Sequence, residues 1–494
     1  MPNRSSDALF QLIKSLEKSE KRNFKLYAKR NSATEDLKIT QLFDAFDKMD
    51  EYDEVLLLKK NKKISKQQLS NTKAHLYRQI LSSLRLIRNE DNIDIQLHEQ
   101  LDYARILYNK GLYLQSLKIL DRIKENAKAT HQFSFLLQVL FFEKKIEGLH
   151  ITRSMQDRAD SLANEVDDVN KRLMVIGRLS NLSLQLYSWY IKNGHARNEK
   201  DEKDLEVFFE KHLRENGDAI NGFYEKLYLY QSYCWYAFIR QDFLLYYRYA
   251  QKWVGLFDKE KFMIEIETAN YIKGLHNLLG AHFDLQNHKK FIEALNDFED
   301  FSHSKTVLQN NNNRIQVFVY LNISRINKHF IEGTFTEGLQ LVPYIEEKLS
   351  EYYLYIDRHR VLVFYYKIAS LYFGSADYEK TVDYLNKIIN WKVDLRTDLQ
   401  CYARLLHLIA HYELGNFQLL EYLIKSVYRF MAKMENLSVV EEEVFNFLRR
   451  SFRVSPARLK PEFEKLLIKL KMQEKKSICN ARICLFGYYF LAGK

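Results

Sequence analysis

Residues 358–390 read RHRVLVFYYKIASLYFGSADYEKTVDYLNKIIN, and this stretch decides which fold the sequence predicts. Its first half places apolar or small side chains at intervals of three, four and seven, at Tyr365, Ile368, Ala369 and Tyr372. Its second half has the same kind of spacing, at Tyr378, Thr381, Leu385 and Ile388. This period predicts two amphipathic helices joined by the polar turn 374–377. One such pair cannot bury both of its faces, so we expect similar pairs on either side.

The composition predicts an almost entirely α-helical chain. Only 4 of the 494 residues are Pro and 15 are Gly, where average usage would give roughly 25 and 35. Helix interiors exclude both residues, whereas β-rich proteins need them at turns. The 33 Tyr and 32 Phe are large enough to fill the space between stacked helices.

Short turns recur along the chain with a common pattern. An aromatic residue stands two positions after a small or polar one, with the first residue at Gly111, Gln241, Gly333, Ala376 and Gly415. Less regular turns fall near positions 151, 194 and 287. The eight turns are spaced roughly 39 to 47 residues apart, which predicts about eight helix-turn-helix units.

The 358–390 stretch resembles a tetratricopeptide repeat. In that family, an aromatic, an aliphatic-small pair and an aromatic on the first helix precede a turn and then an aromatic, a small residue and two apolar positions. The eight residues named above match in that order, although Ala376 replaces a frequent Gly and no Pro closes the unit. The longer spacing is similar to a divergent member with longer helices or loops. The resemblance implies an α-α superhelix, or solenoid, whose groove binds peptides or protein segments.

Carrying the family's groove positions onto this chain selects three first helices. The residues so implied are Tyr228, Gln231 and Trp235, then Tyr320, Ile323 and Asn327, then Tyr366 and Ser370. We expect three regions around them: an N-terminal helical region at 1–98, the repeat array at 99–447 and a basic helical cap at 448–494.

The net charge of +11 is concentrated near the two ends. Residues 55–89 contain nine bases and no acid, and residues 449–476 contain ten bases and three acids. The basic surface predicted near the N-terminus comprises Lys59, Lys60, Lys62, Lys63, Arg78, Arg85 and Arg88. Such blocks either keep the array soluble, contact a protein, or bind the phosphates of nucleic acid or a ribosome.

No pattern in the sequence predicts catalysis or a cofactor. Phosphate-binding Gly-rich loops, nucleophile elbows and zinc-protease motifs are all missing. His407 and His411 are four residues apart but lack a third metal ligand nearby, and Cys479 and Cys484 have no His or acid between them. We therefore expect a protein that is not an enzyme and binds no metal.

Four Cys in 494 residues do not form a disulfide framework. With no signal peptide and no apolar run of about 18 residues, the sequence predicts a cytoplasmic protein that does not enter a membrane. The function that we expect is a protein-interaction scaffold, and the alternative is a regulatory factor associated with nucleic acid or ribosomes.

Overall fold

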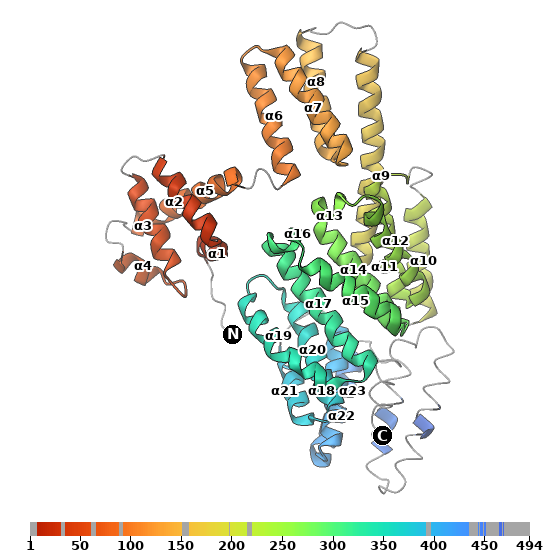
Figure 1. Cartoon of the computed structure of the whole chain (residues 1–494). Helices are drawn as coiled ribbons and strands as arrows, with labels where there is room; N and C mark the ends of the chain where they lie inside the picture. Colours follow the sequence, from red (N-terminus) through yellow and green to blue (C-terminus); the bar gives the residue numbers. More distant parts are fainter. Residues whose placement is uncertain are drawn as a thin grey trace. The chain divides into compact units, whose positions relative to one another are not determined.

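A computed structural model of the chain describes residues 7–30, 35–60, 66–87, 92–150, 158–196, 198–214, 220–391 and 397–433, with a few further positions between 443 and 468. The elements in these ranges are α-helices and one short 3₁₀ helix, and none of the described residues forms a strand (Figure 1). Most helices pack mainly on helices close to them along the chain. The predicted all-α fold of successive helix pairs is therefore confirmed.

The chain divides into two compact units, residues 1–166 and 167–494. The boundary falls inside one long helix, α9 (Arg158–Asn193). The boundaries expected near residues 98 and 447 stay predictions, and the expected basic cap at 448–494 lies almost entirely outside the described residues.

The first unit starts with five helices around one apolar core. They are α1 (Ala8–Ser15), α2 (Lys18–Arg30), α3 (Glu35–Asp47), α4 (Glu54–Lys60) and α5 (Lys66–Ile87). Ile13, Leu42 and Phe46 are fully buried in this core. Lys73 of α5 donates hydrogen bonds to Asp7 (2.9 Å) and to the Tyr52 hydroxyl (2.5 Å). Burial lowers the pKa of Lys73, but these hydrogen bonds outweigh that effect and raise it overall. Lys73 therefore links parts of this core instead of forming a free basic surface.

Three further helices complete the first unit together with the start of α9: α6 (Ile93–Asn109), α7 (Tyr113–Ala129) and α8 (Phe133–His150). The fully buried Glu143 of α8 forms ion pairs with the Lys124 ammonium of α7 at 2.7 Å and with Arg158. A buried carboxylate is tolerated only with such partners.

The second unit contains the rest of α9 and a series of antiparallel helices. They are α10 (Glu199–Arg214), α11 (Phe223–Arg240), α12 (Phe243–Lys259), α13 (Met263–Ile266), α14 (Thr268–Asp284), α15 (His288–Ser302), α16 (Lys305–Leu308), α17 (Asn311–Glu332), α18 (Phe335–Gly338), η1 (Leu339–Leu341), α19 (Val342–Glu351), α20 (Arg358–Gly374), α21 (Tyr378–Ile389), α22 (Thr397–Glu413) and α23 (Phe417–Lys433).

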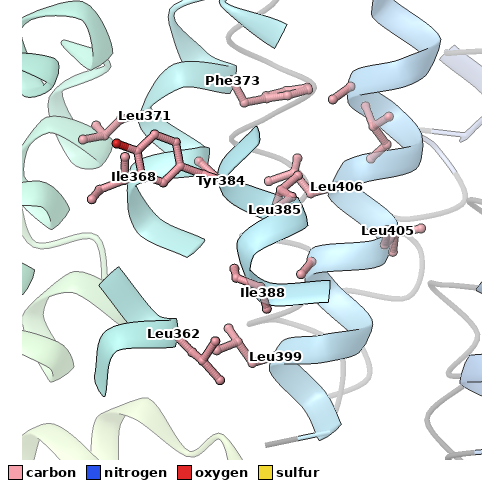
Figure 2. Close-up of a cluster of buried hydrophobic side chains, with 14 of the residues drawn as sticks. Leu362, Ile368, Leu371, Phe373, Tyr384, Leu385, Ile388, Leu399, Leu405 and Leu406 are labelled. Atoms are coloured by element: carbon pink, nitrogen blue, oxygen red, sulfur yellow. The ribbon is translucent and has the colours of Figure 1, made fainter. Parts of the chain in front are cut away.

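The helix pair predicted from residues 358–390 forms as α20 and α21. Ile368, Ala369, Thr381, Leu385 and Ile388 are all fully buried. Figure 2 shows Leu385 and Ile388 close to Leu406 and Leu399 of α22, so the pair buries its apolar face against the next one. Burying one such side chain contributes about 1.5–3 kcal/mol. This confirms the expectation that a single pair needs its neighbour.

The helix-joining turns share one backbone geometry. The five turn residues singled out above all have positive φ, from +59° at Ala376 to +76° at Gly111. The next residue then bonds back to a carbonyl five positions earlier, as from the Asp377 N–H to the Tyr372 oxygen at 3.0 Å. This Schellman motif ends the first helix. The same geometry occurs at Gln286, close to the turn expected at 287, whereas position 151 lies outside the described residues.

The residue after the left-handed position often begins the second helix of the pair. The carboxylates of Asp242 and Asp377 accept the N–H three residues on, at 2.9 and 3.1 Å, and the Asn287 side-chain oxygen does so at 3.3 Å. These N-caps satisfy N–H groups that have no partner within the helix. In these turns, the left-handed residue ends the first helix and the next residue caps the second helix. The third residue is the aromatic one with which the second helix begins.

Candidate functional site

The candidate site is a row of polar and aromatic side chains on α11, α14, α17 and α20, the first helices of four successive pairs. We call it the first-helix face. Gln231 of α11 donates to Asn270 of α14 at 3.0 Å, and Asn270 donates to Glu267 at 2.7 Å. Tyr224 donates its hydroxyl to the same Glu267 at 2.7 Å. Helix α14 packs against α17, which packs against α20. The row therefore continues from pair to pair.

Lys273 of α14 lies among aromatic rings rather than carboxylates. Its ammonium is 5.6 Å from the Trp235 ring centroid and 5.7 Å from that of Tyr187. Within the described part of the chain, the Lys273 ammonium makes neither a hydrogen bond nor an ion pair. Aromatic faces attract a cation but carry no formal charge to neutralise it.

A second cation of the face, Arg360 of α20, is held by Tyr320 of α17. The guanidinium donates to the Tyr320 hydroxyl at 3.1 Å and lies 5.4 Å from the ring centroid. Asp357, one turn earlier, pairs with Arg360 at 3.3 Å. His276 of α14 also stacks on the Tyr320 ring, at a centroid distance of 4.4 Å. The Nδ1 atom of His276 is buried without a hydrogen-bond partner.

The third cation, Lys367 of α20, donates to the Asn327 side-chain oxygen at 2.6 Å. Its ammonium lies 5.3 Å from the Phe330 ring centroid and 5.9 Å from that of Phe283. Asp284 ends α14 near enough to influence Lys367 electrostatically, but the two do not form an ion pair. We refer to Lys273, Arg360 and Lys367 as the cation cluster.

Burial and neighbouring charges shift the pKa values of Lys273, Lys367, Asp284 and His276. Burial lowers the pKa of Lys273, and Arg360 lowers it further. Burial lowers the pKa of Lys367 to about 8, partly opposed by Asp284, and raises the pKa of Asp284 to about 7. The pKa of His276 falls to about 3 through burial and then through all three cations, so the ring is neutral at pH 7. These side chains nevertheless keep partial contact with solvent. An anion arriving from solution could therefore reach them.

The eight groove positions implied by the family resemblance lie on α11, α17 and α20, and none is exposed. Gln231, Ile323, Asn327 and Ser370 are buried, whereas Tyr228, Trp235, Tyr320 and Tyr366 are half-buried. Gln231, Trp235, Tyr320 and Asn327 belong to the contacts of the first-helix face. Ile323 instead packs in the core, and the Ser370 hydroxyl bonds within its own helix to Tyr366 at 2.9 Å.

Sequence reasoning missed the cation cluster itself. The signal that was present is a single cation inside an apolar run, as in the segment FYYKIAS around Lys367. The cation in such a run either lies on the surface or is enclosed by the protein. Only the three-dimensional structure distinguishes these two cases.

The basic surface predicted near the N-terminus is described only in part. Lys59, Arg78 and Arg85 are exposed, and Arg85 pairs with Asp102 at 3.2 Å. The side chain of Lys60 and the residues Lys62, Lys63 and Arg88 lie outside the described residues.

The histidine pair considered as a metal site remains incomplete. His407 and His411 pack edge to face at 4.4 Å, and His411 Nδ1 lies 3.0 Å from the Asn416 amide nitrogen. No group of three or more potential metal ligands occurs among the described residues. Cys479 and Cys484 fall outside those residues.

Fold and first-helix face together define an all-α protein of stacked helix pairs. No family model matches the chain, and the search of curated proteins found no significant match. In the described part of the chain, no helix is both long and apolar enough to cross a bilayer.

Proposed function

We propose that the protein is a non-catalytic cytoplasmic adaptor, built of tetratricopeptide-like repeats, that binds an acidic segment of a partner protein along the first-helix face. The observation that carries this proposal is the cation cluster: three partly desolvated cations on α14 and α20, the helices on either side of α17 in the row, with too few carboxylates around them. Asp357 pairs with Arg360, and Asp284 is only partly ionised at pH 7 because its pKa is about 7. A carboxylate from a partner would supply the missing charge.

A polypeptide segment fits the remaining chemistry of the face. Asn270 and Asn327 each use part of their amide hydrogen-bonding capacity within the face, and the remaining capacity can pair with the N–H and C=O groups of an extended chain. Neighbouring helices pack about 8–10 Å apart, so the path from α11 to α20 is roughly 27 Å. About eight extended residues span that distance. The half-buried rings of Trp235 and Tyr320 offer apolar contact along it.

Affinity capture from a lysate of the source organism tests the proposal after nuclease treatment. The bait proteins are wild type, Lys273→Gln/Lys367→Gln, and the control Lys118→Gln/Lys289→Gln, which removes two exposed lysines elsewhere. We expect one or a few proteins captured by wild type and control, with at least about tenfold less on the cluster variant, since each lost charged hydrogen bond is worth about 1.5–3 kcal/mol.

The captured protein should contain a stretch rich in Asp or Glu, and a synthetic peptide of that stretch should displace it. Equal capture by the cluster variant, with its circular dichroism unchanged, would contradict the proposed site. Capture of only nucleic-acid-dependent proteins, lost on nuclease treatment, would contradict the adaptor function as well.

A further inference from the structure

A second charged surface lies on α2 in the first unit, far along the chain from the first-helix face. Five cations of this helix, with Leu26 among them, line an open depression: Lys18, Lys21, Arg22, Lys25 and Lys29. The single carboxylate within the helix, Glu20, is buried. The solvent side of α2 is therefore almost purely cationic.

Two of the five cations are neutralised by α3, and three are not. Lys21 pairs with Asp47 and Lys25 with Asp44, each at 2.7 Å. Lys18, Arg22 and Lys29 are exposed, and none of their side chains has an ion pair or a hydrogen bond within the described residues. We call these three residues the α2 cation row.

The spacing makes the row a straight one. Positions 18, 22 and 29 follow one another at four and seven residues, so they share one side of the helix. From first to last they extend roughly 16 Å at 1.5 Å per residue. The opposite side, with Phe24 and Ala28, is buried in the core of the first unit, which fixes the row outward. The adjacent helix α5 contains no acidic residue that could compensate the charge.

The residues of the α2 cation row indicate which kind of anionic partner fits them. A helix that docks on a lipid surface needs an apolar side facing the bilayer, but the apolar side of α2 is used internally and Leu26 is the one large apolar residue on the depression. Single-stranded nucleic acid is held by stacking on exposed aromatic rings, and no aromatic residue lines the depression. A straight row of unpaired cations matches the regular phosphates of a duplex, whose strands rise about 3.4 Å per phosphate.

We propose that the α2 cation row is a binding site for the phosphate backbone of a nucleic-acid duplex. Binding there is sequence-independent because phosphate contacts carry no base information. The site is independent of the first-helix face, so either one can bind in the absence of the other.

Fluorescence anisotropy of the full chain with a labelled mixed-sequence 20-base-pair duplex tests this site at 50 to 200 mM KCl. The test variant is Lys18→Gln/Arg22→Gln/Lys29→Gln. The matched control, Lys118→Gln/Arg122→Gln/Lys289→Gln, removes the same charge from exposed positions elsewhere. The exchange variant Lys18→Arg/Arg22→Lys/Lys29→Arg keeps the charge and changes the shape.

We expect wild type, control and exchange variant to bind the duplex, and the test variant to bind at least tenfold more weakly at 50 mM KCl. The slope of log affinity against log salt should become shallower by about 2 to 3, since each phosphate contact contributes about 0.9. Gln keeps the helix propensity, and unchanged circular dichroism checks the fold.

Three results would overturn the proposal. The first is the absence of duplex binding by wild type at 50 mM KCl. The second is equal loss of binding in the control, which would show that only net charge matters. The third is stronger row-dependent binding to vesicles with 30% anionic lipid, or to a 20-nucleotide single strand, than to the duplex.

Discussion

At the scale of one residue, Lys273 shows that the first-helix face lowers the stability of the folded protein. Taking an ammonium out of water without a carboxylate is unfavourable, and the two aromatic rings beside it compensate only in part. A protein selected for stability alone would place an apolar side chain there. Retaining the cation is understandable if it is used in binding, as is common at functional sites.

The Lys273→Met substitution tests this trade-off. Met has a similar length and packs well against aromatic rings, so we expect the free energy of unfolding to stay equal or to rise by about 1 kcal/mol. Capture of the partner should fall at the same time. Urea denaturation and capture on the same preparation measure both quantities, and a loss of stability above 1 kcal/mol would show that the cation is structural.

The pH dependence of partner binding is a second expectation at this scale. Between pH 9 and pH 6, Lys367 gains its proton near pH 8 and Asp284 loses its negative charge near pH 7. His276, with a pKa of about 3, stays neutral throughout this range. Affinity for an acidic segment should therefore rise several-fold as the pH falls.

The variant Asp284→Asn separates the two titrations. It removes the step near pH 7 and leaves the step of Lys367, so its affinity should level off below about pH 7. A pH profile identical to that of wild type would mean that Asp284 does not act on the bound anion. Peptide titrations at constant ionic strength give the profiles.

At the scale of helices, the helix-joining turns show which helix boundaries can be predicted from the sequence. A small or polar residue followed two positions later by an aromatic predicted the turns at Gly111, Gln241, Gly333, Ala376 and Gly415. The structure places each of these residues in the left-handed conformation, which ends a helix and restricts the side chain there. The division of one second helix into α18, η1 and α19 was not predicted. Pro343 stands at the start of α19, where its missing N–H and fixed φ are tolerated.

Paired substitutions at two turns test that explanation. Ala376 has φ of +59°, so Ala376→Gly relieves backbone strain and should stabilise the protein by about 0.5–1 kcal/mol. Gly333 has φ of +69° with nothing within 4 Å of an added Cβ, so Gly333→Ala should cost about 1 kcal/mol through the backbone alone. Chemical denaturation of both variants measures the difference, and shifts of the same sign would contradict it.

The cations of the candidate site could not be predicted from the sequence pattern of single helices. Periodicity identifies which side chains of a helix are apolar, and Lys273 and Lys367 simply interrupt that pattern. Their importance arises from neighbours on other helices, namely Trp235, Tyr187 and Asn327. Four of the residues implied by the family resemblance take part in the contacts of the first-helix face, whereas Ser370 bonds within its own helix and Ile323 packs in the core.

Across the whole molecule, separate cores predict that stability is local. The core around Phe46 contains only residues of α1–α5 and their connections, whereas Phe364 belongs to a different core in the second unit. In arrays of packed repeats, each element depends chiefly on its neighbours.

Phe46→Ala should therefore destabilise the first helices by about 3–5 kcal/mol. Amide hydrogen exchange followed by mass spectrometry should show faster exchange in residues 8–87 and unchanged protection in residues 223–433. Uniformly faster exchange in both ranges would show that the chain unfolds as one cooperative unit.

Binding of acidic polypeptide to the first-helix face through its cation cluster is the central proposal for this protein. The most direct measurement is the anisotropy of a labelled twelve-residue polyglutamate at 50 mM KCl and pH 7, titrated with four proteins. They are wild type, Lys273→Gln/Lys367→Gln, the control Lys118→Gln/Lys289→Gln, and Lys18→Gln/Arg22→Gln/Lys29→Gln. We expect binding by wild type, the control and the α2 variant, and at least tenfold weaker binding by the cluster variant alone. Equal affinity for wild type and the cluster variant, or loss only in the α2 variant, would contradict it.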